Sequence, residues 1–464
     1  MSTLMARVSG LRNFLLIWVG QLISGVGSRL TSFALGLWVY RSTGSTTQFA
    51  MVFMAMAVPT LLLAPFAGAL VDRWDRRRTM IVCECVSAGV IGVLALLAAT
   101  DGLALWHVYL GVGLSTMANV FLQPAYAASV PLLADREQLT RVNGLIQTGQ
   151  SLALVGGPAL AGVLVAFGGI PGVLVVDALT FVVGALFLFM ARIPPQPRAA
   201  PEAQAGNGEA GNGQADTAQA ESGQAGEVGL LQEVRDGWHA IASRPGLRGL
   251  LGINAATSFL FAVASIAITP LVLSVVNQDE RLLGLQMSLA CSGLVVGGLL
   301  VTVFGGPRNK MRGVLLFTAV AGVAIAAHGL APSFALLIVA GFAMFLTLPP
   351  AQASQMALWQ SKLPPETLGR TMATVRMTSE AALPLGYLVA GPLAEFVFEP
   401  AMMPGGALAD TVGVVIGGGP GRGLGLMFLI LGVCMSAVAL FGYGVRGIRR
   451  IDHDVPDAPA HSAA

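Results

Sequence analysis

Residues 68–78 read Gly68-Ala69-Leu70-Val71-Asp72-Arg73-Trp74-Asp75-Arg76-Arg77-Arg78 and carry six charges. They lie between two apolar runs, at roughly 49–67 and 79–99. Each run is long enough to cross the ~30 Å of hydrocarbon in a bilayer. A turn with this many charges cannot lie in lipid, and its four arginines mark that side of the membrane as cytoplasmic. The stretch therefore predicts two membrane-spanning helices joined by a cytoplasmic loop.

The composition extends this prediction to the whole chain. Of its 464 residues, 55% are hydrophobic and 11% are charged, and the mean hydropathy is +0.74. A soluble domain could not bury that much apolar surface, so we expect a polytopic membrane protein. Apolar runs occur at roughly 13–40, 47–70, 79–99, 105–130, 143–167, 170–192, 248–275, 282–304, 313–331, 333–358, 371–397 and 423–444. They predict twelve spans in two sets of six.

The distribution of Lys and Arg predicts the orientation. With a cytoplasmic N-terminus, 21 of the 26 Lys and Arg residues fall on cytoplasmic segments, and only Arg41, Arg281 and Arg422 fall on outer ones. Positive residues favour the cytoplasmic side. We therefore expect a multi-pass protein of the cell (inner) membrane with both termini in the cytoplasm.

The same runs divide the chain into segments. We expect a six-helix bundle over 1–192, a cytoplasmic linker over 193–247, a second bundle over 248–445 and a cytoplasmic tail over 446–464. Residues 194–226 are rich in Ala, Gly, Gln, Pro and Glu, so this part of the linker is predicted to be disordered. Apolar residues recur at helical spacing over about 229–243, which predicts a helix lying in the membrane interface.

The two sets of spans repeat each other. A shift of 229 positions pairs seven identical residues in spans 4–5 and 10–11: Gln123 with Gln352, Glu137 with Glu366, Leu139 with Leu368, Arg141 with Arg370, Gly157 with Gly386, Ala161 with Ala390 and Gly162 with Gly391. The predicted fold is an all-α membrane protein with twelve transmembrane helices in two six-helix bundles. A pseudo-twofold axis along the membrane normal relates the bundles, and such folds bind substrate between their halves.

The spacing G-x-L-x-D-R-x-x-R-R in residues 68–77 resembles the loop between helices 2 and 3 of the major facilitator superfamily of transporters. Its position, directly after the second span, agrees with that resemblance. The family usually carries glycine where this chain has Asp75. The alternative is an ordinary positively charged loop with no further role.

This resemblance implies a conformational latch made of Gly68, Asp72, Arg73, Arg76 and Arg77. Gly68 would let the second span pack closely against its neighbour. Asp72 is expected to face the N-terminal end of the eleventh span, where the helix dipole favours a carboxylate. The arginines would pair with carboxylates at cytoplasmic helix ends, for which Asp135 and Glu137 are available. Such a latch closes one conformation and breaks in the other.

A second resemblance lies in span 5. Residues 156–162 read Gly156-Gly157-Pro158-Ala159-Leu160-Ala161-Gly162 and are similar to the G-P-x-x-G-G motif of superfamily exporters, with Ala161 replacing one glycine. Gly157, Pro158 and Gly162 carry the match, and plain close packing is the alternative reading. Residues 384–394, with residues 72–78 and Gly369-Arg370, look most like the macrolide-efflux branch of the superfamily, which also includes siderophore-type exporters.

Ionisable residues inside spans are functional candidates by default. Five qualify as candidates for proton coupling: Arg29, Glu84, Asp177, Arg376 and Glu380. Glu380 is the leading candidate, and Arg376 stands four residues away on the same helix face, so a structural ion pair is the alternative. We expect Glu84 to reach the inner surface or join the latch, and Asp177 to be structural because helix 6 is peripheral in the superfamily. Span 4 lacks the arginine of drug–proton antiporters.

Neutral polar residues on the expected cavity helices suit an apolar substrate with a few hydrogen-bonding groups. The candidates are Gln21, Ser24, Asn119, Gln123, Asn254, Gln352 and Gln355. No cofactor, metal site or nucleic-acid site is predicted. No Walker A pattern is present either, since neither Lys310 nor Lys362 follows a glycine.

These features predict a transporter and not an enzyme. The expected function is secondary export of amphipathic small molecules, such as drugs, macrolides or siderophore-like compounds, by proton antiport and alternating access. The alternatives are an uptake permease of the same fold and a membrane sensor without transport. The expected partners are the small-molecule substrate, the proton and the lipid bilayer, and we expect a monomer.

Overall fold

The computed structural model describes residues 2–134, 138–191, 193, 238, 241, 245–330, 333–363 and 365–454. Within these ranges every regular element is a helix. The long helices are α1 (Ser2–Thr43), α2 (Thr46–Arg73), α3 (Arg76–Ala99), α4 (Leu105–Leu133), α5 (Leu139–Met190), α7 (Pro245–Val275), α8 (Glu280–Phe304), α9 (Lys310–Gly329), α10 (Phe334–Lys362), α11 (Pro365–Pro392) and α14 (Arg422–Gly444). The short ones are the π-helix η2 (Leu393–Phe398), α12 (Glu399–Met402), α13 (Gly413–Ile416), α15 (Arg446–Arg449) and α16 (Ile451–Asp454).

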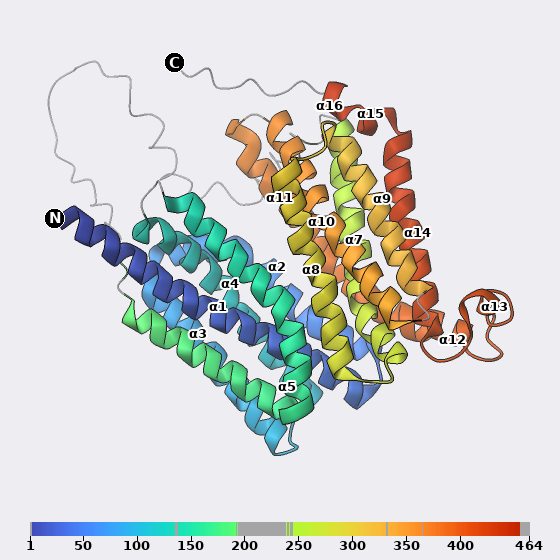
Figure 1. Cartoon of the computed structure of the whole chain (residues 1–464), viewed down its shortest axis with the longest axis horizontal. Coiled ribbons are helices and arrows are strands. Elements are labelled where there is room, and N and C mark those ends of the chain that lie inside the picture. The colour runs from blue at the N-terminus through green and yellow to red at the C-terminus, as the bar shows by residue number, and fades with distance from the viewer. Residues whose placement is uncertain are drawn as a thin grey trace.

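One long helix contains two spans. Eleven helices of the described residues are long and apolar enough to cross a bilayer, and α5 has 52 residues where ~20 suffice. At Gly169 the backbone adopts φ 63° and ψ −172°, a conformation that is essentially restricted to glycine. The chain turns back there (Figure 1), and Pro171 starts the second arm with a φ suited to a helix. The twelve spans predicted from the sequence are therefore present.

The turn between α2 and α3 has a local cap. The Oδ1 atom of Asp75 accepts a hydrogen bond from the backbone N–H of Arg78 at 2.7 Å, so Asp75 is the N-cap of α3. At the matching turn of the second half, Asn309 accepts from the N–H of Arg312 at 2.8 Å. Such caps typically contribute ~1 kcal/mol. The aspartate that replaces the usual glycine therefore stabilises the start of α3.

The helices form two halves that meet at one end and separate toward the end that carries the chain termini (Figure 1). We call the end with the turns near 74, 190, 305 and 363 the terminal side. The end with the turns near 44, 169, 277 and 404 is the distal side. Helices α1–α5 belong to the first half and α7–α14 to the second.

The buried core follows this division. On the distal side one cluster of buried side chains includes residues of both halves, such as Phe49 and Phe428. On the terminal side each half has its own cluster, around Phe14 in the first half and around Trp359 in the second. The halves are therefore packed together on the distal side and separate on the terminal side.

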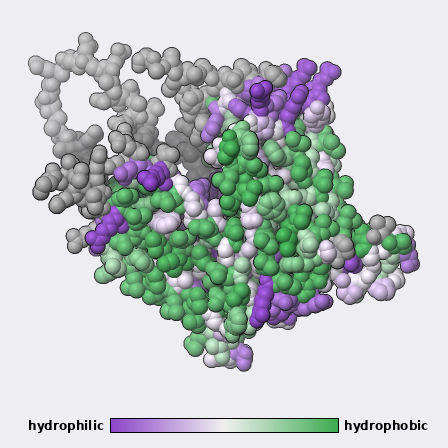
Figure 2. All heavy atoms as spheres, viewed as in Figure 1, coloured by the Kyte–Doolittle hydropathy of each residue, from purple (hydrophilic) through white to green (hydrophobic). Residues whose placement is uncertain are grey.

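Figure 2 shows apolar residues covering the middle of both halves, with hydrophilic residues gathered toward the two ends. This surface suits a protein surrounded by lipid. The linker predicted to be disordered, 194–226, lies outside the described residues. Of the predicted interfacial helix, Trp238 and Ile241 are described, and both are helical. Ile241 is fully buried in one cluster with Leu247 and Trp359, so it packs onto the second half.

Candidate functional site

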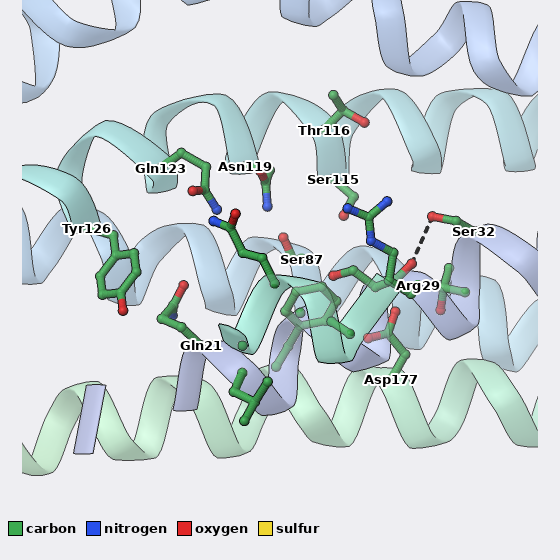
Figure 3. Close-up of a pocket in the computed structure, with 18 of the residues that line it drawn as sticks. Gln21, Arg29, Ser32, Ser87, Ser115, Thr116, Asn119, Gln123, Tyr126 and Asp177 are labelled. Carbon is green, nitrogen blue, oxygen red and sulfur yellow. Dashed lines mark hydrogen bonds between the residues drawn. The ribbon is translucent and has the colours of Figure 1, made fainter. Parts of the chain in front are cut away.

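The first half contains a cavity of about 490 Å³, within the size range of small-molecule sites (Figure 3). Its lining residues come from α1, α2, α3, α4 and α5. Three of the predicted cavity residues, Gln21, Asn119 and Gln123, are among them. Polar lining residues that we did not predict are Ser28, Thr31, Ser32, Ser87, Ser115, Thr116, Tyr126 and Gln150.

The sequence held a signal for some of these missed residues. On α1, Ser28 and Ser32 follow Gln21 at spacings of seven and four positions. On α4, Ser115 and Asn119 are also four positions apart. Such spacings place hydroxyl and amide groups on one helix face. A search for polar residues that recur on one face of an apolar helix would therefore have identified them, whereas inspection of single residues did not.

The other four predicted cavity residues do not line this cavity. Ser24 is buried behind it, where its hydroxyl donates to the Glu84 carboxylate. The side-chain amide of Asn254 donates to the Ser379 hydroxyl on α11. Gln352 is exposed and Gln355 is half-buried on α10. A role for them in substrate binding stays a prediction.

Glu84 does not reach the inner surface as expected. It is fully buried, and its Oε1 atom accepts hydrogen bonds from Gln21 Nε2 at 2.7 Å and from Ser24 Oγ at 3.2 Å. Its Oε2 atom has no hydrogen-bond partner among the described residues. A Cβ at Gly184 would lie 3.0 Å from that oxygen, so the second arm of α5 packs against the carboxylate. The helical periodicity of α3 turns Glu84 toward α1 and α5 instead of toward water.

Asp177 lies at the cavity although we expected a structural position in a peripheral helix. It is 1% exposed and lines the cavity from the second arm of α5. Thr180 Oγ1 donates to its Oδ1 at 3.1 Å. A Cβ at Gly27 would lie 2.3 Å from the same oxygen, so this arm packs closely onto α1. The Oδ2 atom has no hydrogen-bond partner in the described part of the chain.

Arg29 is the cation of the cavity. It lies on α1 and is exposed to the cavity. A Cβ at Gly157 would come within 2.6 Å of the Arg29 Cβ, so the motif of span 5 packs directly against α1 at this residue. Figure 3 shows the guanidinium directed toward the helix that carries Ser115 and Thr116.

The predicted pair on α11 is formed, but away from this cavity. Arg376 Nε lies 2.8 Å from Glu380 Oε1. The Arg376 side chain is 79% exposed and that of Glu380 is 29% exposed. Neither residue lines the cavity of the first half.

The loop predicted as a latch is partly described. Arg76 Nη1 donates to the carbonyl oxygen of Ala128 at 2.6 Å, and Arg77 Nε donates to that of Leu188 at 3.1 Å. Both arginines thus contact helix ends of their own half. Among the described residues, a Cβ at Gly68 would meet no atom within 4 Å, so the close packing expected at this glycine is not seen there. The side chains of Asp72, Asp135 and Glu137 lie outside the described residues.

On the distal side, the motif of span 5 contacts the second half. A Cβ at Gly162 would lie 3.3 Å from the Cα of Gly284 on α8, and one at Gly284 would lie 2.4 Å from the carbonyl oxygen of Pro158. The backbone N–H of Ala159 donates to Ser288 Oγ at 2.9 Å. Small residues on both helices are what allow this approach.

A carboxylate joins the halves on the same side. Glu395 of η2 accepts hydrogen bonds from Ser45 Oγ and Thr47 Oγ1, both at 2.8 Å, and from the Thr47 N–H at 3.3 Å. Ser45 is the N-cap of α2, so the carboxylate lies at the positive end of that helix. Arg41 forms an ion pair with Glu280 across the same junction. These contacts hold the distal side closed.

Two helical halves that are packed together on one side, with a polar cavity and an apolar outer surface, are the architecture of a membrane transporter. The sequence profile of the Major Facilitator Superfamily matches residues 17–387. The chain therefore belongs to this superfamily, and it is a multi-pass membrane transporter of small molecules.

Several similar proteins are named as efflux proteins. Macrolide efflux protein A of Streptococcus pyogenes is 26% identical over 445 residues, which cover 95% of this chain and 97% of that protein. The multidrug efflux pump Tap of Mycolicibacterium fortuitum is 24% identical over 82% of this chain and 89% of its own. Among solved structures, a bacterial homologue of the human lysosomal transporter Spinster has a TM-score of 0.67 at 14% identity, covering 96% of this chain and 98% of that chain. This last likeness supports the fold alone.

Proposed function

We propose that the protein is a secondary active exporter that moves amphipathic small molecules out of the cytoplasm in exchange for protons. The observation that carries this proposal is the similarity, along almost the whole chain, to macrolide efflux protein A. The cavity agrees with it, because polar groups such as Gln21 and Asn119 line it together with apolar residues such as Phe181.

The proposal includes an orientation. The 21 Lys and Arg residues that the sequence assigns to cytoplasmic segments include Arg78 and Arg312, which lie on the terminal side. They favour a cytoplasmic position for that side and for both termini. We propose that the two bundles extend over 1–192 and 248–445, and that the protein is a monomer in the cell membrane. In this orientation the halves separate toward the cytoplasm, so substrate would enter the cavity from that side. Export then requires the distal side to open.

Drug accumulation in intact cells tests the proposed function. The protein should be expressed in a bacterium that lacks its own efflux pumps, and uptake of radiolabelled erythromycin, ethidium and a fluorescent carboxylate followed. Export by proton antiport predicts a lower steady-state level of at least one compound, restored by a protonophore. Higher accumulation would indicate an uptake permease. Unchanged accumulation of all three compounds would contradict export.

Glu395→Gln should shift the protein toward conformations with an open distal side. The carboxylate accepts three hydrogen bonds at the start of α2, and hydrogen bonds to an ionised acceptor are stronger than neutral ones. Losing its charge there should destabilise the closed distal side by ~1–2 kcal/mol, which is about a tenfold change in the equilibrium. Spin labels at the exposed residues Thr100 and Asn277, one in each half, would measure it as a larger population at long distances.

Glu399→Gln is the matched control. Glu399 lies one turn further along the chain, and its Oε1 accepts from the N–H of Gly421 within the second half. This variant removes the same charge from the same side, at a carboxylate whose hydrogen bond among the described residues lies within the second half. Equal shifts in the two variants, or no shift in Glu395→Gln, would rule out Glu395 as the residue that holds the halves together.

A further inference from the structure

The charged groups of the cavity differ in how far a ligand can reach them. Arg29 is exposed to the cavity, whereas Asp177 is 1% exposed and Glu84 is fully buried. Both carboxylates already accept hydrogen bonds from protein side chains. Within the described ranges the Arg29 guanidinium has neither an ion-pair nor a hydrogen-bond partner. A ligand that enters the cavity therefore meets a positive charge first.

The packing around α1 keeps these opposite charges apart. Gly27 faces the second arm of α5, where a Cβ would collide with Asp177 and Thr180. Arg29 is two positions further, which is about 200° around a helix, and its Cβ rests against Gly157 of the first arm. Figure 3 shows the guanidinium directed away from Asp177 and toward α4. Arg29 is therefore available to a ligand without any side chain having to move away from it.

The surroundings of Arg29 add neutral donors and apolar walls. The hydroxyl groups of Ser28, Ser32, Ser115 and Thr116 line the cavity. Trp18, Met56 and Phe181 line it as well. A guanidinium offers a planar fork of donors that matches carboxylate and phosphate geometry. The hydroxyl groups of Ser115 and Thr116 can donate to the remaining lone pairs, whereas those of Ser28 and Ser32 donate to backbone carbonyl oxygens of α1. The apolar side chains suit a hydrocarbon or aromatic body.

We propose that this cavity binds amphipathic organic anions and that Arg29 holds the anionic group, a carboxylate, phosphate, sulfonate or phenolate. The inference deepens the proposed export function and rests on it. It separates this protein from a carrier that selects cationic amphipaths, because an unpaired guanidinium in a membrane-embedded cavity repels a second cation. The ionised group binds beside α1 and α4, and the apolar body lies against Trp18 and Phe181.

Binding by the full-length protein in lipid nanodiscs tests this. The probes are pyrenebutanoate, pyrenebutanol and pyrenebutylamine, which share one apolar body and differ in charge. Energy transfer from protein tryptophans, including Trp18 in the cavity wall, reports binding, with empty nanodiscs correcting for partition into lipid. The wild type should bind the carboxylate at least about tenfold more tightly than the amine. Arg29→Gln should weaken carboxylate binding about tenfold and change alcohol binding by less than about twofold.

Two further variants make the result specific. Arg29→Lys keeps the charge but loses the planar fork, so it should retain part of the preference. Arg376→Gln removes the other intramembrane arginine, which lies outside this cavity, and should leave the binding of all three probes unchanged. A wild type that prefers the amine or the alcohol, or that binds none of the probes, overturns the proposal without reference to any variant. An equal loss for all three probes in Arg29→Gln does so too.

Transport of the same probes separates this inference from the proposed function. In proteoliposomes, a carboxylate preference in binding together with movement of no probe in either direction would reject export and keep the anion site. Export of the amine in preference to the carboxylate would reject the anion site and keep export.

Discussion

Asp72→Asn should abolish transport while the amount of protein in the membrane stays nearly unchanged. The family resemblance implies that the Asp72 carboxylate meets the N-terminal end of α11 when the terminal side closes, where the helix dipole stabilises a carboxylate by up to ~1–2 kcal/mol. Helix α2 ends at Arg73 and α11 begins at Pro365, both on the terminal side. Since such a contact acts in one conformation only, its loss stops the cycle without unfolding either half.

Asp75→Asn is the control for this variant. Asp75 lies in the same turn and caps α3 of its own half, and asparagine is an equally good N-cap. This variant removes one charge from the loop but keeps the local structure. Efflux rates and membrane abundance should be measured side by side for both. Native transport by Asp72→Asn would mean that the loop is only a signal for membrane orientation. An equal loss in Asp75→Asn would contradict a specific role for Asp72.

Asp177→Asn should uncouple the carrier from the proton gradient. A coupling carboxylate must respond to the substrate and exchange protons with both sides in turn. Asp177 lines the cavity and has no ion-pair partner in the described part of the chain. From the sequence we predicted Glu380 instead, but its carboxylate is paired with Arg376 away from the cavity. The geometry therefore favours Asp177.

The expected loss is large. One proton that enters down 100 mV releases ~2.3 kcal/mol, and each tenfold gradient requires ~1.4 kcal/mol, so one charge supports about a 40-fold accumulation. A ΔpH of about 1.7 units supplies the same free energy per proton. In proteoliposomes with this ΔpH imposed, Asp177→Asn should lose the accumulation and still exchange substrate without a gradient.

Glu380→Gln and Glu84→Gln serve as the competing variants. If Glu380→Gln alone abolishes ΔpH-driven accumulation, the original prediction is right and Asp177 is structural. If Glu84→Gln abolishes this accumulation, the coupling group is Glu84, whose carboxylate accepts a hydrogen bond from the cavity residue Gln21. If substrate accumulation by the wild-type protein depends on neither ΔpH nor membrane potential, proton antiport itself is contradicted.

The sequence alone determined the spans, the turns and the family. In lipid, the backbone N–H and C=O groups of a single run of about twenty apolar residues can all be hydrogen-bonded only in a helix. A run such as 79–99 therefore forms a helix whatever surrounds it. The charged stretch at 68–78 must leave the membrane for the same reason. Gly169 and Asp75 act through their own backbone and next neighbours, and both lie where the sequence placed a turn.

Only the tertiary structure decided which helix faces meet. Periodicity puts Glu84 on one face of α3, but the approach of α1 and the glycine at 184 make that face a buried one. In the same way, Gly27 and Gly157 bring α5 against α1 on two sides. Arg29 is left exposed to the cavity, while Asp177 lines its wall but stays buried. A charge in a span predicts a functional residue. Whether it is buried, paired or free depends on helix tilt and on small residues from distant spans, which no local pattern of the chain contains.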